Sequence, residues 1–593
     1  MSKNVGNIRR SQIISTFGPG AIVDFRLPGS GALLSGVMQG LEAWEAYTKG
    51  GYKQDVVREP RLEALLGVDH FRAPPVGTYQ KEGQTKDRVL PVERFPDWLS
   101  CPECHVINRS GQWAPSRNGD SLHCGRCRGK PAVVPVRFVT ICEKGHLDDF
   151  PWTSWLTHEA GCSGPVLALK TIGAGIGGLL LTCKSCGARR SMSEAFSPKG
   201  IPGHKCRGGR PWLGGRETGC EATPRTTQRG ASNVYFSIEQ SAITLPDWKV
   251  GFADRLQDHL KALSRRKGDD AALIDYINYD VLPDWDGDDT AENIARLYRE
   301  FSEGNTEAEE DLRLDEFRML LTDTSSSDED ASILLNRHQP VPDVLSGVIS
   351  SISSVERLRE VRALTGFTRL KAQVGGEPDP VPLSRSDLSW LPAVAMHGEG
   401  VFLSLNLEAV SNWEERPDVD AHLLQLIQTH MDSARAEGKQ VDNAPSQLNA
   451  RYMLVHTLAH ALIARLSLDS GYSSSALRER LYVGPNMAGL LIYTSTPDAD
   501  GTMGGLSRQA RPARMEQLVL QALADHELCS ADPLCSEGMA RSGSNGNHAA
   551  CHNCVFLPET SCEAWNGFLD RNLLSAGSLS YFKDLLEPSI LKS

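Results

Sequence analysis

The sequence predicts a multidomain α+β protein with a ribbon-rich N-terminal half and a mixed α/β C-terminal domain. Three observations lead to this prediction. The chain has 593 residues, too many for a single hydrophobic core. Its 15 cysteines all fall in two windows, 101–220 and 529–562, so they act in groups rather than as scattered core residues. Outside these windows, apolar residues follow both helical and strand spacing.

Shifts in composition divide the chain into four predicted segments. Residues 1–100 form an N-terminal α+β segment, and residues 101–231, rich in Gly, Pro and Arg, form a region of short ribbons and loops. Residues 232–352 form a helical, acidic linker region with a flexible loop near 322–332. Residues 353–593 form the C-terminal domain.

Local patterns predict the individual elements. Gly18-Pro19-Gly20 is typical of a tight turn between two short strands. Apolar spacing predicts a strand at 233–238, helices within 246–345, and a helix followed by a strand over 353–370. The C-terminal domain is expected to contain, in order, a strand at 400–407, a helix at 421–438, a buried helix at 447–468 with Ser446 as N-cap, a strand at 488–496, a Gly-rich turn at 498–506 and a helix at 513–528.

Charge and hydropathy limit the class of protein. The net charge of -12 argues against a protein that coats nucleic acid with its whole surface. Residues 184–229 are an exception, with ten Lys or Arg against three Glu, an excess that either binds phosphates or offsets the charge of metal–thiolate centres. No apolar run is long enough to span a membrane, and the N-terminus lacks a signal-peptide stretch. The sequence therefore predicts a cytoplasmic protein, without a membrane partner, whose thiols stay reduced.

The first four cysteines have the spacing of a zinc ribbon. Cys101 and Cys104 form one C-x-x-C pair, and Cys124 and Cys127 form a second pair after 19 intervening residues. Because each pair can donate two thiolates to one tetrahedral ion, this spacing predicts a structural zinc site. A redox dithiol is the alternative, and two pairs at ribbon spacing argue against it.

The rest of the first window offers ligands for two more zinc sites. One predicted group consists of Cys142, His146, His158 and Cys162, with His158 as its weakest member because a lone His beside an aromatic residue is more often a packing residue. The other predicted group consists of Cys183, Cys186, Cys206 and Cys220. Exchange of ligands between the two groups is an open alternative.

The second window offers five thiols for four ligand positions. Cys551, Cys554 and Cys562 are predicted ligands, and either Cys529 or Cys535 supplies the fourth thiolate while the other is a spare buried thiol. The two windows together predict about four zinc ions. Their ligand shells are closed, which leaves no position for a reacting water and indicates structural rather than catalytic metal.

Sequence motifs for common enzyme chemistries are absent. The chain contains no phosphate loop of the form GxxxxGK[ST], no GxSxG elbow and no dinucleotide fingerprint after a strand. His456 and His460 are the best catalytic candidates, because residues four apart stack on one face of a helix and could share a metal. A buried, hydrogen-bonded structural role is the competing interpretation. No Glu follows His456 directly, so the metalloprotease pattern HExxH is not met.

Two sets of stretches resemble known families. LVHTLAHALIARLSLDSGYSSSALRERLYV, LIYTSTPDADGTMGGL and the final cysteines with ETSCEAWNGFLDR resemble the zinc-binding domain of MrfA-type helicases, although this chain has no motor motif. RRSQIISTFGPGAIVDF, CEKGHLDDFPW, PWLGG and ERLREVRALTGFTRL resemble the DrmB family, the motor-less component of the bacterial DISARM anti-phage system. The resemblance runs from about Arg9 to Arg571. It implies a DrmA-like helicase as the partner that supplies the ATPase, and a methyltransferase that marks host DNA.

The preferred functional hypothesis is a non-catalytic zinc-binding subunit of an anti-phage complex. It would form a heterodimer with the helicase, help it to bind foreign DNA and control its ATPase. The predicted DNA contacts are the basic residues Arg189, Arg190, Lys205, Arg207 and Arg210. One alternative is a metal-dependent nucleic-acid enzyme that uses His456 and His460. The other is a free-standing zinc-ribbon DNA-binding protein, which the acidic overall charge disfavours.

Overall fold

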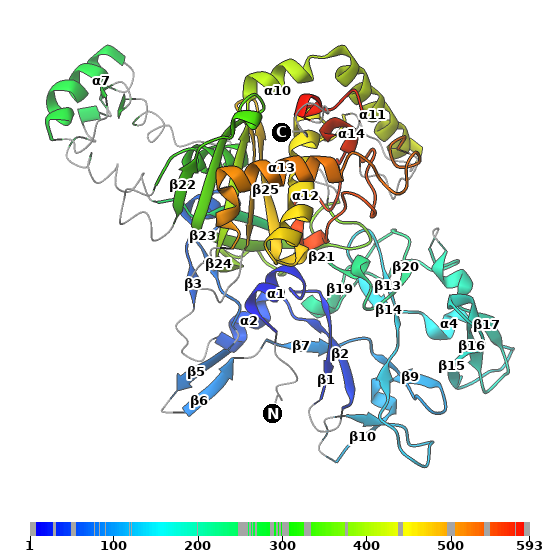
Figure 1. Ribbon diagram of the computed structural model, residues 1–593. Helices are drawn as coiled ribbons and strands as arrows, with labels where there is room; N and C mark the ends of the chain where they lie inside the picture. The colour runs from blue at the N-terminus through cyan, green and yellow to red at the C-terminus, as the bar shows by residue number, and fades with distance from the viewer. Residues whose placement is uncertain are drawn as a thin grey trace. The chain divides into compact units, whose positions relative to one another are not determined.

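The structure is a computed structural model (Figure 1). It describes residues 8–27, 31–48, 55–75, 77–81, 84–88, 90–117, 119, 121–197, 200–246, 256, 259, 262–263, 265–266, 270–284, 290–291, 294–295, 298, 308–324, 334–373, 378–436, 443–494, 505–538, 546–575 and 577–585. Most residues of the helices predicted within 246–345, of the loop near 322–332 and of the Gly-rich turn at 498–506 lie outside the described residues.

The chain folds into two compact units that are both discontinuous in sequence. Unit 1 comprises Met1–Glu63, Gly67–Ser241 and Val361–Ala395, and unit 2 comprises Ala64–Leu66, Ala242–Glu360 and Met396–Ser593. Both units contain strands and helices, and the mixed α+β class predicted from the sequence is confirmed. Residues 361–395, assigned from the sequence to the C-terminal domain, belong to unit 1.

Unit 1 is built from short strands in several small antiparallel sheets. The largest has the order β12-β8-β9-β15-β16-β17. Its strands are β8 (Trp98–Ser100), β9 (Val106–Arg109), β12 (Val134–Pro135), β15 (Leu167–Thr171), β16 (Leu179–Cys183) and β17 (Arg189–Ser191). One three-stranded sheet has the order β1 (Ile22–Arg26), β2 (Leu33–Met38) and β7 (Val92–Arg94). A second has the order β14 (Leu147–Asp149), β13 (Phe138–Ile141) and β20 (Arg225–Gln228).

The remaining elements of this part of the chain are short. The two-stranded pairs are β5 (Gly77–Lys81) with β6 (Gln84–Arg88), β10 (Ala114–Pro115) with β11 (Leu122–His123), and β18 (Gly209–Arg210) with β19 (Gly215–Arg216). The other short elements are α1 (Arg10–Ser15), α2 (Leu41–Thr48), α3 (Pro60–Leu66), α4 (Trp152–Trp155), β3 (Val56–Val57) and β4 (His70–Arg72).

The turn at Gly18-Pro19-Gly20 does not join two strands as predicted, because helix α1 precedes it and only β1 follows. Glycine is required at position 20. Its φ is +89°, and a Cβ there would lie 2.6 Å from the ring of Phe367. The turn is therefore set by close packing within unit 1.

A buried arginine ties distant segments of unit 1 together. Arg369 Nε donates to the carbonyl oxygen of Gly145 at 2.8 Å, and Nη2 donates to that of Gly20 at 2.9 Å. Nη1 donates to the carbonyl oxygen of Val234. Burial lowers the pKa of Arg369 to about 9. The guanidinium thus satisfies three backbone carbonyls that the sheets of the unit leave unpaired.

Unit 2 is organised around a large sheet with the strand order β21-β23-β24-β26-β25, to which β22 is added beside β23. The strands are β21 (Phe236–Ile243), β22 (Leu335–Gln339), β23 (Ile349–Thr368), β24 (Trp390–Leu405), β25 (Leu477–Gly484) and β26 (Met487–Thr494). Strands β21, β23 and β24 have residues in both units. The strands predicted at 233–238, 400–407 and 488–496 correspond to β21, β24 and β26.

The helix predicted at the start of 353–370 is wrong, because the single strand β23 covers this stretch. Apolar residues at Val355, Leu358, Val361 and Leu364 recur every third residue, which imitates helical spacing. In a strand, the same spacing alternates between the two faces. Both faces of β23 are buried along most of its length, so both faces take apolar side chains.

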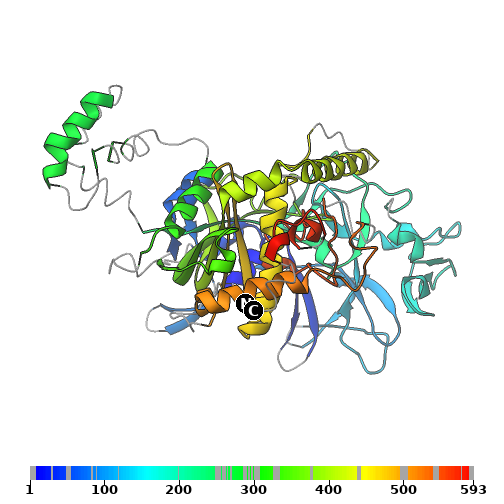
Figure 2. The ribbon, with the colours of Figure 1, turned by 45° about the horizontal axis from the view of Figure 1, so that its top comes forward.

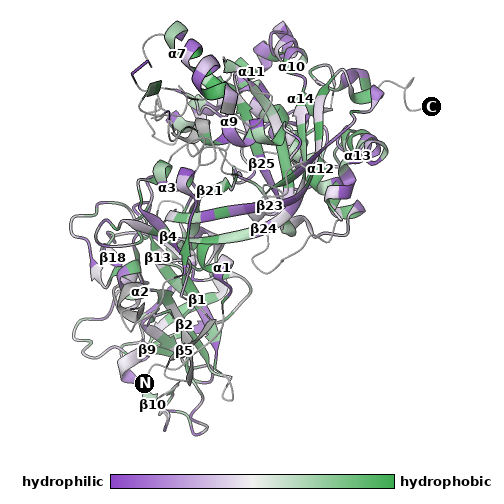
Figure 3. Cartoon of the chain, turned by 90° about the vertical axis from the view of Figure 1, so that its left-hand side faces the viewer, coloured by the Kyte–Doolittle hydropathy of each residue, from purple (hydrophilic) through white to green (hydrophobic). Residues whose placement is uncertain are grey.

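Helix α12 (Ala450–Asp469) confirms the predicted buried helix. It packs against β25, β26 and α13 (Pro512–Asp525), as Figures 1 and 2 show. In Figure 3, β25 and the neighbouring strands carry both hydrophobic and hydrophilic residues, and the sequence of β25 is LRERLYVG. The predicted N-cap Ser446 is wrong, because Asn449 Oδ1 accepts the N–H of Tyr452 at 2.8 Å and caps the helix.

Among the residues of unit 2 that the structure describes, the further α-helices are α7 (Asp270–Tyr276), α9 (Ala308–Leu320), α10 (Leu407–Glu414), α11 (Pro417–Ala436) and α14 (Arg571–Leu574). The helices predicted at 421–438 and 513–528 correspond to α11 and α13. Within the described ranges, no helix combines the length and hydropathy that a membrane span requires.

A fully buried ion pair joins α9 to β25. Arg480 Nε and Nη2 donate to the two carboxylate oxygens of Glu316 at 2.5 and 2.7 Å, and neither side chain is exposed. Tyr482 Oη and the Ile243 N–H donate to the same carboxylate at 3.1 and 2.9 Å. Burial opposes the charge on Arg480, but the carboxylate of Glu316 raises the pKa of Arg480 well above its usual range. Every charge in this cluster therefore has a partner.

Replacing Arg480 with Met should destabilise unit 2 by about 3–5 kcal/mol, because it leaves the Glu316 carboxylate buried without its cation. Urea unfolding of the purified protein measures this loss. The control is Arg337→Met, which removes a half-exposed ion pair of 3.2 Å with Glu356 and should cost less than about 1 kcal/mol. Equal losses in the two variants would contradict the assigned role of the buried pair.

Candidate metal centres

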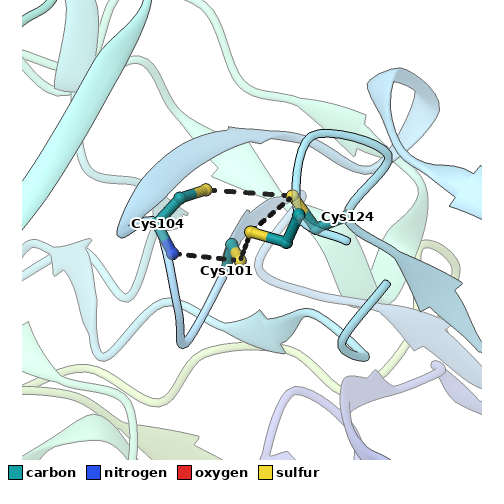
Figure 4. A group of neighbouring side chains, drawn as sticks. Cys101, Cys104 and Cys124 are labelled. Atoms are coloured by element: carbon teal, nitrogen blue, oxygen red, sulfur yellow. Dashed lines mark hydrogen bonds between the residues drawn. The ribbon is translucent and has the colours of Figure 1, made fainter. Parts of the chain in front are cut away.

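The first candidate centre lies in unit 1 between the predicted C-x-x-C pairs (Figure 4). The sulfur atoms of Cys101 and Cys127, of Cys104 and Cys124, and of Cys124 and Cys127 are each 3.8 Å apart. Four sulfurs bound tetrahedrally to zinc at about 2.3 Å would be separated by about 3.8 Å. The four thiols therefore fit one zinc ion.

Local backbone geometry positions these thiols. Cys101 and Cys104 lie in the turn between β8 and β9, where the Cys104 N–H points to the sulfur of Cys101 at 3.4 Å. His105 follows with a φ of +60°, which closes the turn. Leu99, Val106, Trp113 and Val133 pack around Cys101 and Cys124 as a small core. Burial in this core raises the pKa of the Cys101 thiol, while the N–H of Cys104 acts in the opposite direction and favours the thiolate.

The second candidate centre consists of Cys142, His146, Cys206 and Cys220. The sulfur of Cys206 lies 3.6 Å from that of Cys142 and 3.5 Å from His146 Nδ1, and Cys142 Sγ lies 3.4 Å from His146 Nδ1. Tetrahedral zinc would place a sulfur and a nitrogen ligand about 3.6 Å apart. The hydrogen bond to Cys206 lowers the pKa of Cys142, which favours its thiolate.

A carboxylate orients the histidine of this second centre. His146 Nε2 lies 3.0 Å from Glu217 Oε2, and Arg210 pairs with the same carboxylate. A hydrogen bond on the far ring nitrogen fixes the tautomer, so that Nδ1 presents its lone pair to a metal. Glu217 was not among the residues predicted from the sequence. A carboxylate that supports a ligand follows no spacing rule.

The third candidate centre consists of His158, Cys162, Cys183 and Cys186. The sulfurs of Cys162 and Cys183 are 4.0 Å apart, and Cys186 Sγ lies 3.5 Å from His158 Nδ1. Backbone N–H groups of Ala188 and Glu159, with His158, lower the pKa of Cys186 to about 6, so this thiol ionises readily.

The structure therefore groups the ligands of unit 1 differently from the first prediction. Cys142 and His146 join Cys206 and Cys220, while His158 and Cys162 join Cys183 and Cys186. This is the exchange of ligands that the sequence left open. Cys162 lies close to β16, which ends at Cys183, whereas Cys206 lies beside the turn that holds Cys142 and His146.

The fourth candidate centre lies in unit 2 and consists of Cys529, Cys535, Cys551 and Cys554. The sulfurs of Cys529 and Cys551, and of Cys551 and Cys554, are 3.6 Å apart, and those of Cys535 and Cys554 are 3.7 Å apart. These distances also match a tetrahedral thiolate shell. Both Cys529 and Cys535 belong to this group, whereas the sequence prediction includes only one of them.

The sequence predicts Cys562 as a ligand of the fourth centre, but the structure places this cysteine in a different group. Its sulfur lies 3.2 Å from His456 Nε2, in a group that also contains His460 and Glu479. All four of these residues are buried, and the histidines and Glu479 are at most 1% exposed. Neither His456 nor His460 has any side-chain surface exposed to solvent.

The five basic residues predicted to contact DNA have different environments in unit 1. The side chains of Arg189 and Lys205 are exposed. Arg190 stacks on Trp155 and pairs with Glu194 at 2.8 Å. The other two, Arg207 and Arg210, make ion pairs with Asp148 and Glu217.

Comparison with known proteins supports both metal binding and a defence role. Residues 9–236 match a family described as Domain of unknown function (DUF8724), and residues 458–555 match the MrfA Zn-binding domain. The chain is 30% identical over 541 residues to the DISARM protein DrmB of Bacillus paralicheniformis, an alignment that covers 87% of this chain and 93% of the relative. With the cysteine and histidine groups, the MrfA match identifies zinc as the cofactor, in about four sites. The matched range contains the cysteines of the fourth centre and ends before Cys562.

Substituting Ser for Cys529 or for Cys535 should each lower the zinc content by about one ion per chain, because each removes one of four thiolates from the same shell. Inductively coupled plasma mass spectrometry of the purified protein measures the ratio. The control is Ser536→Ala in the same segment, which should keep full zinc content. Retention of all zinc by either cysteine variant would show that this thiol is spare.

Proposed function

The chain belongs to the DrmB family of DISARM defence proteins, and from this membership we propose that it is a non-catalytic, zinc-binding subunit of an anti-phage complex. The observation that carries the proposal is the 30% identity to a DISARM protein DrmB along 87% of the chain. Each candidate metal group offers four protein ligands, which leaves no open position for a reacting water and supports a structural role for the metal. Free thiols gathered into such groups fit the cytoplasm, where cysteines stay reduced.

The proposed zinc ligands are the four groups in which ligand atoms lie at tetrahedral distances. They are Cys101, Cys104, Cys124 and Cys127; Cys142, His146, Cys206 and Cys220; His158, Cys162, Cys183 and Cys186; and Cys529, Cys535, Cys551 and Cys554. Three of these groups lie among the short strands of unit 1, beside the hydrophobic clusters around Cys101 and Trp155, and would stabilise these strands. Rigid ribbons of this kind are suited to hold partner surfaces in place.

The proposed partner is a DrmA-like DNA helicase that supplies the ATPase. The sequence of this chain has no phosphate loop, which supports the assignment of ATP hydrolysis to a partner subunit. In a heterodimer, the zinc-bearing subunit would help the helicase to bind foreign DNA and would control its ATPase rate.

The proposed DNA contacts are the basic residues predicted from the sequence, led by Arg189 and Lys205. These two side chains are exposed, so a phosphate can reach them without breaking an internal ion pair. Arg190, Arg207 and Arg210 lie nearby in sequence but already pair with carboxylates, so each would have to share its charge with DNA.

Co-expression of this chain with the helicase encoded beside it should yield a stable complex on size-exclusion chromatography. The DNA-stimulated ATPase rate of the complex should differ from that of the helicase alone. A variant of the helicase that cannot hydrolyse ATP should still form the complex but should abolish the ATPase signal. Failure to co-elute, together with an unchanged ATPase rate, would overturn the proposed partnership.

The double variant Arg189→Glu with Lys205→Glu should weaken DNA binding by the complex. The slope of the logarithm of the binding constant against the logarithm of salt concentration should become less steep, by the equivalent of about two phosphate contacts. Fluorescence anisotropy at several salt concentrations measures both effects. Arg435→Glu is the control, because Arg435 is 60% exposed on α11 of unit 2 and its reversal also adds negative charge. If the control weakens binding to the same extent per charge, the effect reflects net charge and not contact.

A further inference from the structure

We infer that His456, His460, Glu479 and Cys562 form a fifth metal centre, a closed site for zinc in unit 2 that is separate from the four-cysteine centre. Their ligand atoms all lie within 4.8 Å of one another. The inference does not rest on the proposed role in phage defence, since it follows from the side chains of one buried cluster.

The distances in the cluster are close to those of a first coordination shell, and the two at His456 Nε2 are slightly shorter. His456 Nε2 lies 3.2 Å from Cys562 Sγ and 3.1 Å from Glu479 Oε1, and His460 Nε2 lies 3.5 Å from Glu479 Oε2. Nitrogen, oxygen and sulfur ligands around tetrahedral zinc are about 3.3–3.6 Å apart. Two imidazoles, one carboxylate and one thiolate are ligand types that zinc accepts together.

The hydrogen bonds around His460 leave an unpaired nitrogen directed at the centre. His460 Nδ1 lies 2.7 Å from the carbonyl oxygen of Val555, so Nδ1 carries the proton and donates it. The neutral ring then presents the lone pair of Nε2 to Glu479 Oε2, and neither atom has a hydrogen-bond partner. Two buried acceptors facing each other repel unless a cation lies between them. A carbonyl on the far nitrogen is also the usual support for a metal-bound histidine.

The surroundings of Cys562 resemble those of the cysteines in the other centres. The backbone N–H groups of Ala564 and Asn566 point to its sulfur at 3.3 and 3.2 Å. In the fourth centre, the N–H of Ala531 points to the sulfur of Cys529 at 3.4 Å. Backbone donors of this kind stabilise a thiolate, which is the form that binds metal.

The charges of the cluster balance when a divalent ion is bound. The thiolate of Cys562 and the carboxylate of Glu479 contribute two negative charges, and the two neutral imidazoles contribute none. A Zn²⁺ ion makes the buried group neutral, which removes the cost of an uncompensated charge in the protein interior. Because all four positions are protein ligands and the site is buried, the ion would be structural rather than catalytic.

The centre would join three elements that are far apart in sequence. His456 and His460 lie on α12, Glu479 lies on β25, and Cys562 follows a short 3-10 helix, Glu559–Ser561. Val555, whose carbonyl holds His460, directly follows Cys554 of the fourth centre. One residue thus links the ligand shells of the two centres in unit 2.

The test is the zinc content of the full-length protein and of the variants Cys562→Ser and Glu479→Gln. The wild type should carry about five zinc ions per chain, and each variant about one fewer. Ser561→Ala is the matched control, because it changes a buried neighbour of Cys562 that supplies no ligand and should keep the wild-type content. Circular dichroism reports whether each variant is folded.

A folded Cys562→Ser protein with unchanged zinc content would overturn the proposal and leave the cluster as a hydrogen-bonded ion pair. If the variants do not fold, the wild-type ratio decides: about five ions per chain support the fifth centre, and about four overturn it. Replacement of zinc by Co²⁺ in the wild-type protein allows the tetrahedral sites to be counted independently, by their absorption. The fifth centre should add one equivalent of tetrahedral cobalt absorption, and its absence would likewise overturn the proposal.

Discussion

The tetrahedral zinc shell is the constraint on which the architecture of unit 1 depends. Its strands are short, and those of several pairs have only two residues. Such ribbons bury too little apolar surface to be stable alone. A zinc ion changes this balance because it fixes four ligands about 3.8 Å apart, and its binding free energy becomes folding free energy. The hydrophobic clusters around Cys101 and around Trp155 then complete a core that the metal has already positioned.

The sequence could predict which residues bind metal better than it could predict how they group. Pairs within one turn, such as Cys101 with Cys104, are placed by the turn itself. The choice of partner for Cys142 depends on closing a long loop, since Cys206 is 64 residues away. The entropy of loop closure does not decide between Cys162 and Cys206 as this partner, because each doubling of loop length costs only about 0.6 kcal/mol. The packing of the strands decides between Cys162 and Cys206, and that packing is not visible in the spacing.

The same contrast applies to the fold. Helix α12 was predictable because its apolar residues cover nearly every face and the helix is buried. Strand β23 was not, because Val355, Leu358 and Val361 fit helical spacing and only the sheet shows that both faces are covered. The buried polar groups of unit 2 follow no local pattern at all. Asp570 accepts a hydrogen bond from His422 at 2.6 Å, and although burial opposes its charge, His422 and His548 together lower the pKa of Asp570 to about 2. Satisfied networks of this kind help to specify one packing of the core.

The discontinuity of unit 1 has a consequence for how the protein is made. A ribosome delivers the chain from its N-terminus, yet unit 1 requires Val361–Ala395, which emerges only after Ala242–Glu360 of unit 2. Until Arg369 arrives, the carbonyl oxygens of Gly20 and Gly145 lack the guanidinium that pairs with them. The four ligands of the first centre, by contrast, all lie within residues 101–127, so this ligand set is complete long before Val361–Ala395 is synthesised. Zinc binding at that stage would give the nascent chain one ordered ribbon before the segment that completes unit 1 has been made.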